Sequence, residues 1–431
     1  MEGRVGQQQP VGAASEPQRG DSPTIKAPPR TVAFGALRHA NFRLFFGGMV
    51  ISLLGMWMHR VALSWLVLEL TDSPFYVGLV DALTFLPVLF FSLYAGALAD
   101  RVSKRRMVMA TQTGAMVLAS ALAAFVLTDT VTIWHVIVVA AGIGTAMAFD
   151  IPARQSFIVE MVGKEDLTNA IALNSSAFNG TRVVGSAIAG LLIAGVGIAI
   201  CFVINGVTYL PMIAALALMR LPPHTTSAER SSAWSNIKAG FRYVVSESRV
   251  RGVIVNIALL SVFGLPVLTL LPVVARDVLG LGAVAYGTMM SAVGVGAVSG
   301  ALSIAAFGHR LHRGRLLARS SFAFGLIVVL FALTRSYPLA LGLLALIGFA
   351  FLTTTVLSNT LLQTIAPDEL RGRVIAFYAF AFVGFAPFGG LLGGAAAERF
   401  GTTPTLLVGG AVCVAGVLLG VRRSAALRET R

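Results

Sequence analysis

The sequence predicts an all-α integral membrane protein of twelve transmembrane helices, and two observations carry this prediction. Hydrophobic residues occupy 56% of the 431 positions, whereas Asp, Glu, Lys and Arg together occupy 12%. A soluble chain has about 25% charged residues, because water must solvate its surface. The apolar residues also fall into segments of about 20, the length of helix that crosses a bilayer. Lipid is therefore the solvent that this composition implies.

Twelve segments are long and apolar enough to be spans. They are expected at 44–69, 76–98, 107–128, 132–152, 168–195, 198–219, 252–276, 284–307, 315–335, 338–363, 373–397 and 403–421. One uncharged run, at 183–219, is too long for a single span. The Gly195-Val196-Gly197 sequence divides that run into two helices, because paired glycines favour a break.

Lys and Arg are unevenly distributed between the two sets of loops. With the N-terminus in the cytoplasm, 28 of the 33 lie on the cytoplasmic side and three, Arg276, Arg335 and Arg399, on the other. Cytoplasmic loops carry an excess of Lys and Arg, so both termini are expected inside the cell. Because the bases are scattered in short clusters between spans, the net charge of +14 does not indicate nucleic-acid binding.

The chain divides into two halves of six spans. We expect an N-terminal half at 34–219 and a C-terminal half at 252–423. The connection at 220–251 has helically spaced apolar residues between bases, which predicts an amphipathic helix on the cytoplasmic membrane surface. Residues 1–33 and 424–431 are expected to be cytoplasmic tails, the first disordered because it is rich in Gln, Pro, Gly and Ser.

A motif stands in the loop between the second and third spans. It reads Gly96-Ala-Leu-Ala-Asp100-Arg101-Val-Ser-Lys104-Arg105-Arg106, and it resembles the loop signature of the major facilitator superfamily. The glycine permits close approach of helices, the aspartate accepts hydrogen bonds at a helix N-terminus, and the bases hold the loop inside. The resemblance implies a cytoplasmic gate here. A plain cluster of positive-inside residues is the alternative.

The cytoplasmic end of the fourth span carries a second candidate for the gate. By the resemblance, Asp150 pairs with a base of the loop, Arg101 or Arg105. Arg154 lies four residues after Asp150, so a simple pair within one helix would use the same carboxylate. Both alternatives remain open at this point.

Three further stretches narrow the resemblance to one bacterial branch of the superfamily. They are Asn41-Phe-Arg-Leu-Phe45, Phe149-Asp-Ile-Pro-Ala-Arg-Gln155 and Pro367-Asp-Glu-Leu-Arg-Gly-Arg373. They are similar to enterobactin exporters, macrolide efflux pumps and transmembrane secretion effectors, over about residues 34–423. The resemblance implies a monomer in the bacterial inner membrane. It also implies proton-driven efflux of a small molecule such as a drug, a siderophore or another metabolite.

Ionisable residues inside spans are costly, and they usually serve function. Arg60, beside His59, lies well within the first span, and Asp81 lies at a similar depth in the second. An ion pair between Arg60 and Asp81 is expected, and its loss on protonation of Asp81 offers a route to proton coupling. A static pair that fixes two helices is the alternative.

The fifth span presents a polar face toward the expected substrate cavity. Asn174, Phe178 and Arg182 recur every four residues, and Asn179 lies one turn before Arg182. Arg182 is expected to bind an anionic or polar group of the substrate, with bonding to carbonyls of a neighbouring helix as the alternative. Other polar candidates for the cavity are His59, Asn256, Tyr286 and Tyr378.

No catalytic constellation accompanies these features. The sequence has no HExxH, GxSxG or Walker motif, and Cys201 and Cys413 both lie in apolar segments. We therefore expect a secondary transporter with no metal and no cofactor, whose partners are a small-molecule substrate, protons and the lipid bilayer. An uptake carrier or uniporter of the same fold is the first alternative. A non-transporting receptor or assembly factor is the second.

Overall fold

The computed structural model describes residues 2–3, 35–99, 101–163, 165–219, 233–307 and 312–423. Within them the secondary structure is helical, without strands, and twelve helical segments are long and apolar enough to cross a membrane. This confirms the predicted fold class. The expected tails at 1–33 and 424–431 and the gate residue Asp100 lie outside the described residues.

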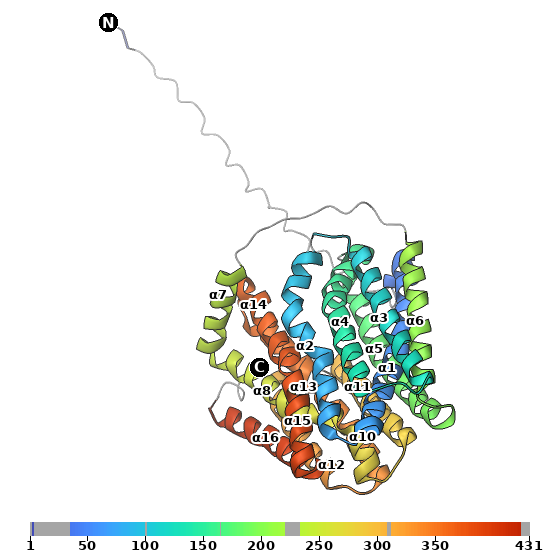
Figure 1. Ribbon diagram of the computed structural model, residues 1–431. Coiled ribbons are helices and arrows are strands. Elements are labelled where there is room, and N and C mark those ends of the chain that lie inside the picture. Colours follow the sequence, from blue (N-terminus) through green and yellow to red (C-terminus); the bar gives the residue numbers. More distant parts are fainter. Residues whose placement is uncertain are drawn as a thin grey trace.

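The first six spans form the N-terminal half (Figure 1). After the short turn η1 (Gly35–Arg38) they are α1 (Ala40–Thr71), α2 (Pro74–Ala99), α3 (Lys104–Leu127), α4 (Ile133–Val162), α5 (Leu167–Gly195) and α6 (Ala199–Leu218). We call the face at which α1 begins the termini side, and the face at which it ends the far side. Successive spans cross between these two sides in alternate directions.

Helix α4 extends ten residues beyond its predicted end at 152. The expected boundary was placed at Pro152, but proline inside a helix often bends it without ending it. Residues beyond the proline are buried, and Phe157 packs edge-on against Phe45 of α1 with ring centroids 5.8 Å apart. Tertiary packing therefore extends the helix past the apolar segment.

The C-terminal half begins after helix α7 (Ala233–Ser246). Its first span is broken into α8 (Ser248–Leu259), η2 (Leu260–Gly264), α9 (Pro266–Thr269), α10 (Leu271–Val273) and η3 (Val274–Val278). The others are α11 (Ala283–Phe307), α12 (Arg313–Leu333), α13 (Tyr337–Ile365), α14 (Asp368–Ala379) continued by η5 (Phe380–Gly384) and α15 (Ala386–Phe400), and α16 (Thr402–Arg423).

Two spans of this half are bent at π-helical turns. The turn η2 precedes Pro266, and η5 precedes Pro387, so each wide turn lies where proline leaves a carbonyl without its helical donor. The Ser261 hydroxyl in η2 donates a hydrogen bond to the Phe382 carbonyl in η5, at 3.0 Å. The bend of the seventh span at Gly264-Leu265-Pro266 is thus bonded to the bend of the eleventh span.

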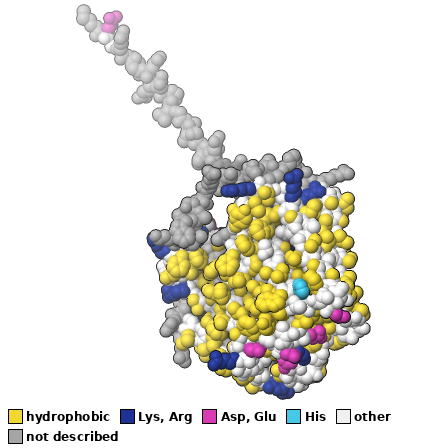
Figure 2. Space-filling model, in the orientation of Figure 1, with side chains coloured by type: hydrophobic (Ala, Val, Ile, Leu, Met, Phe, Trp, Pro, Cys, Tyr) yellow, Lys and Arg dark blue, Asp and Glu magenta, His cyan; other side chains and the backbone are white. Residues whose placement is uncertain are grey.

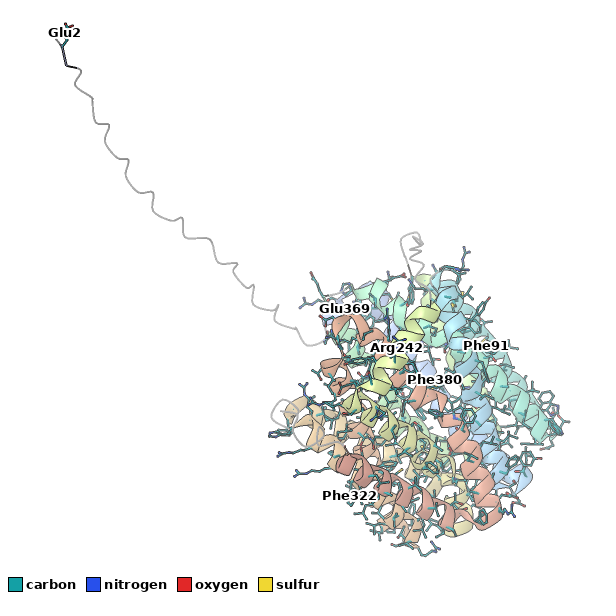
Figure 3. The ribbon with its side chains drawn as sticks, turned by 90° about the vertical axis from the view of Figure 1, so that its left-hand side faces the viewer. Glu2, Phe91, Arg242, Phe322, Glu369 and Phe380 are labelled. Atoms are coloured by element: carbon teal, nitrogen blue, oxygen red, sulfur yellow. The ribbon has the colours of Figure 1, made fainter. Side chains whose placement is uncertain are left out.

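The amphipathic helix expected in the connection is α7, which carries Arg242 (Figure 3). Gly240 lies against α14, where an added Cβ would be 3.0 Å from the side chains of Arg373 and Phe377. Phe241 and Val245 are exposed, so much of an apolar stripe of this helix lies outside its contact with α14. Such a stripe beside exposed bases fits a helix lying in the membrane interface. Residues 220–232 lie outside the described part.

The two halves contact each other closely on the far side. A Cβ on Gly78 of α2 would overlap the Gly390 carbonyl of α15 and lie 3.0 Å from Gly394 Cα. In a second contact, a Cβ on Gly190 of α5 would lie 2.8 Å from the Ala283 carbonyl of α11. All these glycines lie in the far-side portions of their helices, so the closure between halves is on that side.

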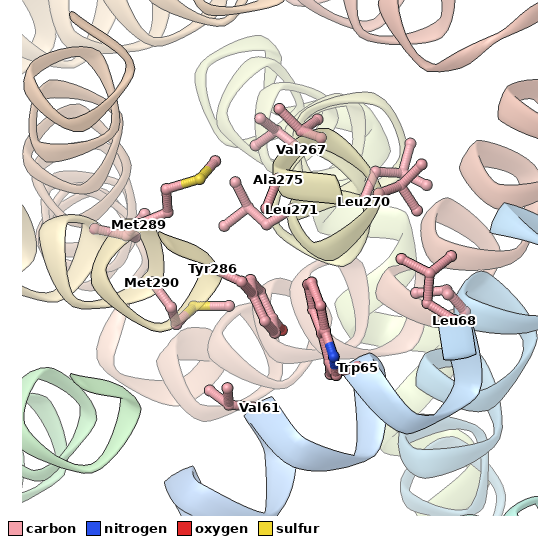
Figure 4. Close-up of a cluster of buried hydrophobic side chains, with 14 of the residues drawn as sticks. Val61, Trp65, Leu68, Val267, Leu270, Leu271, Ala275, Tyr286, Met289 and Met290 are labelled. Carbon is pink, nitrogen blue, oxygen red and sulfur yellow. The ribbon is translucent and has the colours of Figure 1, made fainter. Parts of the chain in front are cut away.

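A buried apolar layer fills the same closure (Figure 4). Trp65 of α1 stacks on Tyr286 of α11, with ring centroids 6.0 Å apart and an interplanar angle of 19°. Leu270, between α9 and α10, and Leu271, which begins α10, are fully buried in the same cluster as Leu68 of α1. Because this layer combines apolar residues from both halves, it excludes water from the far side of the interface.

The surface of the described residues also fits a membrane protein. Figure 2 shows apolar side chains over most of the visible face, with Lys and Arg near its upper, left and lower edges. On the helical body, the acidic side chains visible in this view lie near the bottom, among the lower Lys and Arg. A broad uncharged zone between two charged rims matches the hydrocarbon layer between two headgroup layers.

Candidate transport cavity and interface between the halves

An ion pair inside the membrane joins the first two spans and reaches the other half. An Arg60 Nη donates to Asp81 Oδ1 at 3.1 Å. The other Asp81 oxygen accepts a hydrogen bond from the Thr269 hydroxyl of α9, at 2.8 Å. Asp81 is therefore bonded to both halves at once. The structure makes the contact expected between Arg60 and Asp81, while its role in proton coupling stays a prediction.

Arg182 of α5 is a buried cation with incomplete hydrogen bonding. Its residue is 8% exposed, and its Nε and one Nη have no hydrogen-bond partner. The Arg182 and Arg60 guanidinium carbons each lie 5.7 Å from the centroid of the Trp57 ring. Two cations thus share one indole ring, and the carboxylate of Asp81 is bonded to Arg60. Buried donors without partners require an explanation, and a bound anion is one.

A central cavity of about 370 Å³ lies on the termini side of this group. Its lining comes from all six spans of the N-terminal half and from Val383 of the other half. Phe85 and Phe178 form part of its apolar wall, and Asn174 and Gln155 are among its polar residues. The predicted residues Asn174 and Phe178 therefore face one cavity. Phe178 also packs edge-on against Trp57 at 5.3 Å, which connects the cavity wall to the two arginines.

Asp150 lines the same cavity and is held by several donors. The Thr111 hydroxyl and the Gln112 amide donate to its Oδ1 at 2.9 and 3.1 Å. Arg154 donates to its Oδ2 from Nε at 2.8 Å and from Nη2 at 2.6 Å. The arrangement is the pair within one helix, and it places a charged but fully bonded group in the cavity wall.

The expected contacts of Asp150 with the loop bases are not made in this conformation. Arg105 instead donates to the carbonyls of Ala217 and Met219 at the end of α6, at 2.8 and 3.2 Å. Lys104 pairs with Glu160 of α4. No atom lies within 4 Å of a Cβ built on Gly96, so this glycine makes no close helix contact here. The loop bases belong to the same half as Asp150, and the Asp150 carboxylate is already bonded to Thr111, Gln112 and Arg154.

The remaining candidates lie outside the central cavity. His59 packs against Phe202 with ring centroids 5.1 Å apart, Asn179 donates to the Ser175 carbonyl, and Tyr286 belongs to the buried apolar layer. Two others are bonded within the C-terminal half. Tyr378 donates to the Thr355 carbonyl, and Asn256 donates to Ser321.

Three residues at this site were not singled out from the sequence. Gln112 is a polar residue within an apolar span, and that signal was available. Trp57 and Thr269 carry no such signal. Trp57 is one of many large apolar residues, and Thr269 matters only because the fold brings its span against Asp81.

Polar bonds between halves complete the closure at the far-side surface. Arg276 donates to the Asp72 carboxylate at 2.7 Å and to the Leu68 carbonyl at 3.0 Å. Glu398 of α15 accepts a hydrogen bond from the Ser73 hydroxyl at 2.8 Å. Each bond joins a residue of the C-terminal half to the corner between α1 and α2.

Two curated relatives cover nearly the whole chain. The staphyloferrin A transporter of Staphylococcus aureus (strain NCTC 8325 / PS 47) is 25% identical over 392 residues, which are 90% of this chain and 97% of the relative. The enterobactin exporter EntS of Escherichia coli O1:K1 / APEC is 26% identical over 383 residues, which are 88% of this chain and 91% of the relative.

Solved transporters share the fold. The nucleoside transporter NupG superposes with a TM-score of 0.72 at 14% identity, covering 91% of this chain and all of its own. A bacterial homologue of the human lysosomal transporter Spinster, in an inward-facing and occupied conformation, superposes with a TM-score of 0.71 at 12% identity. The match covers 90% of this chain and 98% of the homologue. The family model for transmembrane secretion effectors matches residues 31–430. The chain therefore belongs to the transmembrane secretion effector family of the major facilitator superfamily, and it is a multi-pass secondary transporter of the bacterial cell membrane.

Proposed function

We propose that this protein exports a small molecule carrying an anionic group, and that a proton gradient drives the export. The observation that carries the proposal is the position of Asp81. This one titratable carboxylate is bonded to Arg60 of its own half and to Thr269 of the other half, beside the incompletely bonded Arg182.

The direction of opening follows from the loop charges. By sequence position, 28 of the 33 Lys and Arg fall in the segments that adjoin the span ends of the termini side, so that side faces the cytoplasm by the positive-inside rule. The central cavity then lies toward the cytoplasm and the apolar layer toward the outside, which is an inward-facing arrangement. The moving bodies are the halves at 34–219 and 252–423, connected through 220–251, and the working unit is a monomer.

Proton coupling through Asp81 has a simple physical basis. Protonation removes the carboxylate charge, so the ion pair with Arg60 is lost and the hydrogen bond from Thr269 is weakened. The bond between halves at this depth therefore depends on whether Asp81 holds a proton. A closure that changes with proton occupancy is the minimal requirement for coupling conformation to a proton gradient.

The substrate class follows from Arg182 and from the relatives. A guanidinium with unfilled donors in a low-dielectric site favours a carboxylate, a phenolate or another planar anion. The curated relatives are named for staphyloferrin A and enterobactin. By analogy, the substrate proposed for this chain is a siderophore or a small metabolite of similar size, whose body occupies the cavity lined by Phe85 and Phe178. Arg182 is buried and does not line that cavity in this conformation, so its contact with the anionic group forms at another stage of the cycle.

Asp81→Asn is expected to abolish the proton-driven part of export. Asn keeps the size of the side chain and a hydrogen-bonding oxygen, but it neither binds a proton nor pairs with Arg60 as a charge. The measurement is accumulation of labelled siderophores, macrolides and other lipophilic drugs in cells with and without the protein, each with and without a protonophore. For an exported compound, the change in accumulation that the protonophore causes should be no larger with the Asp81→Asn variant than in cells without the protein.

Asp129→Asn is the matched control, because Asp129 lies exposed between α3 and α4 and Asn tolerates its positive φ of 53°. Protonophore-sensitive export that persists in Asp81→Asn would refute the coupling role. If no compound is exported although the protein is folded in the membrane, the efflux function itself loses its support.

Arg182→Gln is expected to raise the KM for an anionic substrate by about 10-fold or more, since a hydrogen bond to a charged group contributes about 1.5–3 kcal/mol. Arg182→Lys keeps the charge, so its KM should rise less. Thermal unfolding of purified Arg182→Gln distinguishes a role in substrate binding from a role in stabilising the fold. Because Nε and one Nη of Arg182 lack protein partners, the unfolding temperature should stay constant or rise. A marked fall would identify Arg182 as a structural residue.

A further inference from the structure

A second cavity of about 330 Å³ lies in the C-terminal half, between α8, α12 and α16. We call it the lateral cleft. It shares no lining residue with the central cavity. Its walls are mostly Val, Leu, Ala and Gly, and Ser248 and Arg251 lie at its termini-side end. The sequence placed Asn256 in the substrate cavity, but the structure places it in this cleft.

The depth of the lateral cleft matches one leaflet of a bilayer. Its lining on α8 runs from Ser248, the first residue of that span, to Leu259. Eleven residues of helix rise about 16 Å, and the hydrocarbon core is about 30 Å thick. Val255 and Leu419, which line the cleft, are 51% and 53% exposed. Large apolar side chains exposed within a span face lipid, so the cleft opens toward the bilayer.

The end of the cleft nearest the middle of the membrane has no polar group that calls for a polar ligand. The Asn256 amide donates to the Ser321 hydroxyl at 3.0 Å, and that hydroxyl donates to Thr354, so the polar side chains there bond to protein. Beyond them the space narrows between Phe324 and Cys413. An apolar chain fits this end, whereas a charged group would lose its hydration without gaining a partner.

The termini-side end of the cleft, at the membrane surface, is basic. Arg251 is fixed there by donating to the Val245 carbonyl at the end of α7, at 2.6 Å. Arg249 and Arg242 are exposed nearby on α8 and α7. No acidic residue lines the cleft among those that the structure describes, and the neighbouring Glu247 caps α8 by accepting from the Arg249 amide. Basic residues at the ends of spans attract anionic headgroups.

We propose that the lateral cleft binds one phospholipid with an anionic headgroup. An acyl chain occupies the apolar cleft, and the phosphate contacts Arg251 at the termini-side end of the cleft. The lipid fills the space between α8, which belongs to the bent seventh span, and the pair α12 and α16. It therefore stabilises this side of the C-terminal half. The inference does not depend on the transported substrate or on the coupling ion.

The test uses the full-length protein in nanodiscs of phosphatidylcholine alone or mixed with phosphatidylglycerol. Native mass spectrometry counts retained lipids, and thermal unfolding reports stabilisation. Wild type should retain one phosphatidylglycerol and unfold at a higher temperature when that lipid is present. Arg251→Gln should lower the preference for phosphatidylglycerol over phosphatidylcholine by about fivefold, the effect of one basic residue at the surface. Arg249→Gln is the control, since Arg249 does not line the cleft.

A second variant fills the cleft without a clash. A Cβ on Gly420 meets no atom within 4 Å, so Gly420→Leu should fold and exclude the acyl chain, and the retained lipid should be lost. Gly342→Leu, equally unobstructed but outside the cleft, should keep it. The proposal is overturned if Gly420→Leu retains phosphatidylglycerol as wild type does, or if Arg251→Gln keeps the full preference. It is also overturned if a photoreactive lipophilic substrate labels the cleft and phosphatidylglycerol does not compete.

Discussion

Gly78→Leu is expected to abolish transport while leaving the protein folded. A Cβ at this position would overlap the Gly390 carbonyl and lie 3.0 Å from Gly394 Cα, so the far side cannot close as it does here. Backbone atoms cannot move aside as a flexible side chain does. A bias of about 5.5 kcal/mol is enough to invert a 99:1 conformational equilibrium. Because the obstructing atoms belong to the other half, the fold within each half is unaffected, and the variant should stay open on the far side.

Cysteine labelling can follow this opening, because the native residues Cys201 and Cys413 are both buried. A Leu271→Cys reporter lies in the buried apolar layer. An impermeant maleimide applied from the far side should not label the reporter alone, and it should label the reporter combined with Gly78→Leu. Gly114→Leu is the control, since its added Cβ meets nothing within 4 Å. Normal transport by Gly78→Leu would contradict the proposed movement at this contact.

Gly296→Ala is expected to prevent accumulation of folded protein. Its Cβ would overlap the Ala345 carbonyl group, at 2.6 Å from the carbonyl carbon, where α11 crosses α13. Both helices belong to the C-terminal half, so no movement between the halves relieves the clash. The free energy of unfolding should fall by more than about 4 kcal/mol, the range reached when a core contact is overpacked without an escape.

The amount of detergent-extracted, monodisperse protein measures this outcome. Gly342→Ala lies on the same α13, and its added Cβ meets no atom. Its free energy of unfolding should stay unchanged or rise by up to about 1 kcal/mol, because alanine has the higher helix propensity. If Gly296→Ala accumulates and unfolds at the wild-type temperature, α11 and α13 do not pack as closely as described.

The spans could be predicted because hydrophobic length and the loop charges are local properties of the sequence. The contact between Arg60 and Asp81 could also be predicted, since both residues lie at similar depth in consecutive spans. The positions of Asn256 and Tyr378 could not be predicted. Residue number along a span fixes depth, but in a helix that is apolar all round it does not fix which neighbour a polar side chain faces.

The partner of Asp150 illustrates a different limit. The sequence left Arg105 and Arg154 both open, and packing decides between them, because Arg154 lies one turn away on the same helix whereas Arg105 donates to carbonyls at the end of α6. Thr269 shows the same limit for contacts between halves. Its bond to Asp81 spans 188 residues of sequence, and no local pattern indicates it.

The hydrogen bond from Ser261 to the Phe382 carbonyl has a mechanical consequence. Each partner belongs to the π turn at which its span bends, so straightening one span withdraws the donor or the acceptor from the other. The hydrogen bond therefore couples the two bends, so that the seventh and eleventh spans bend together. Within the described residues of the N-terminal half there is no π turn. This paired joint has no counterpart in that half, so the two halves differ in how their spans can bend.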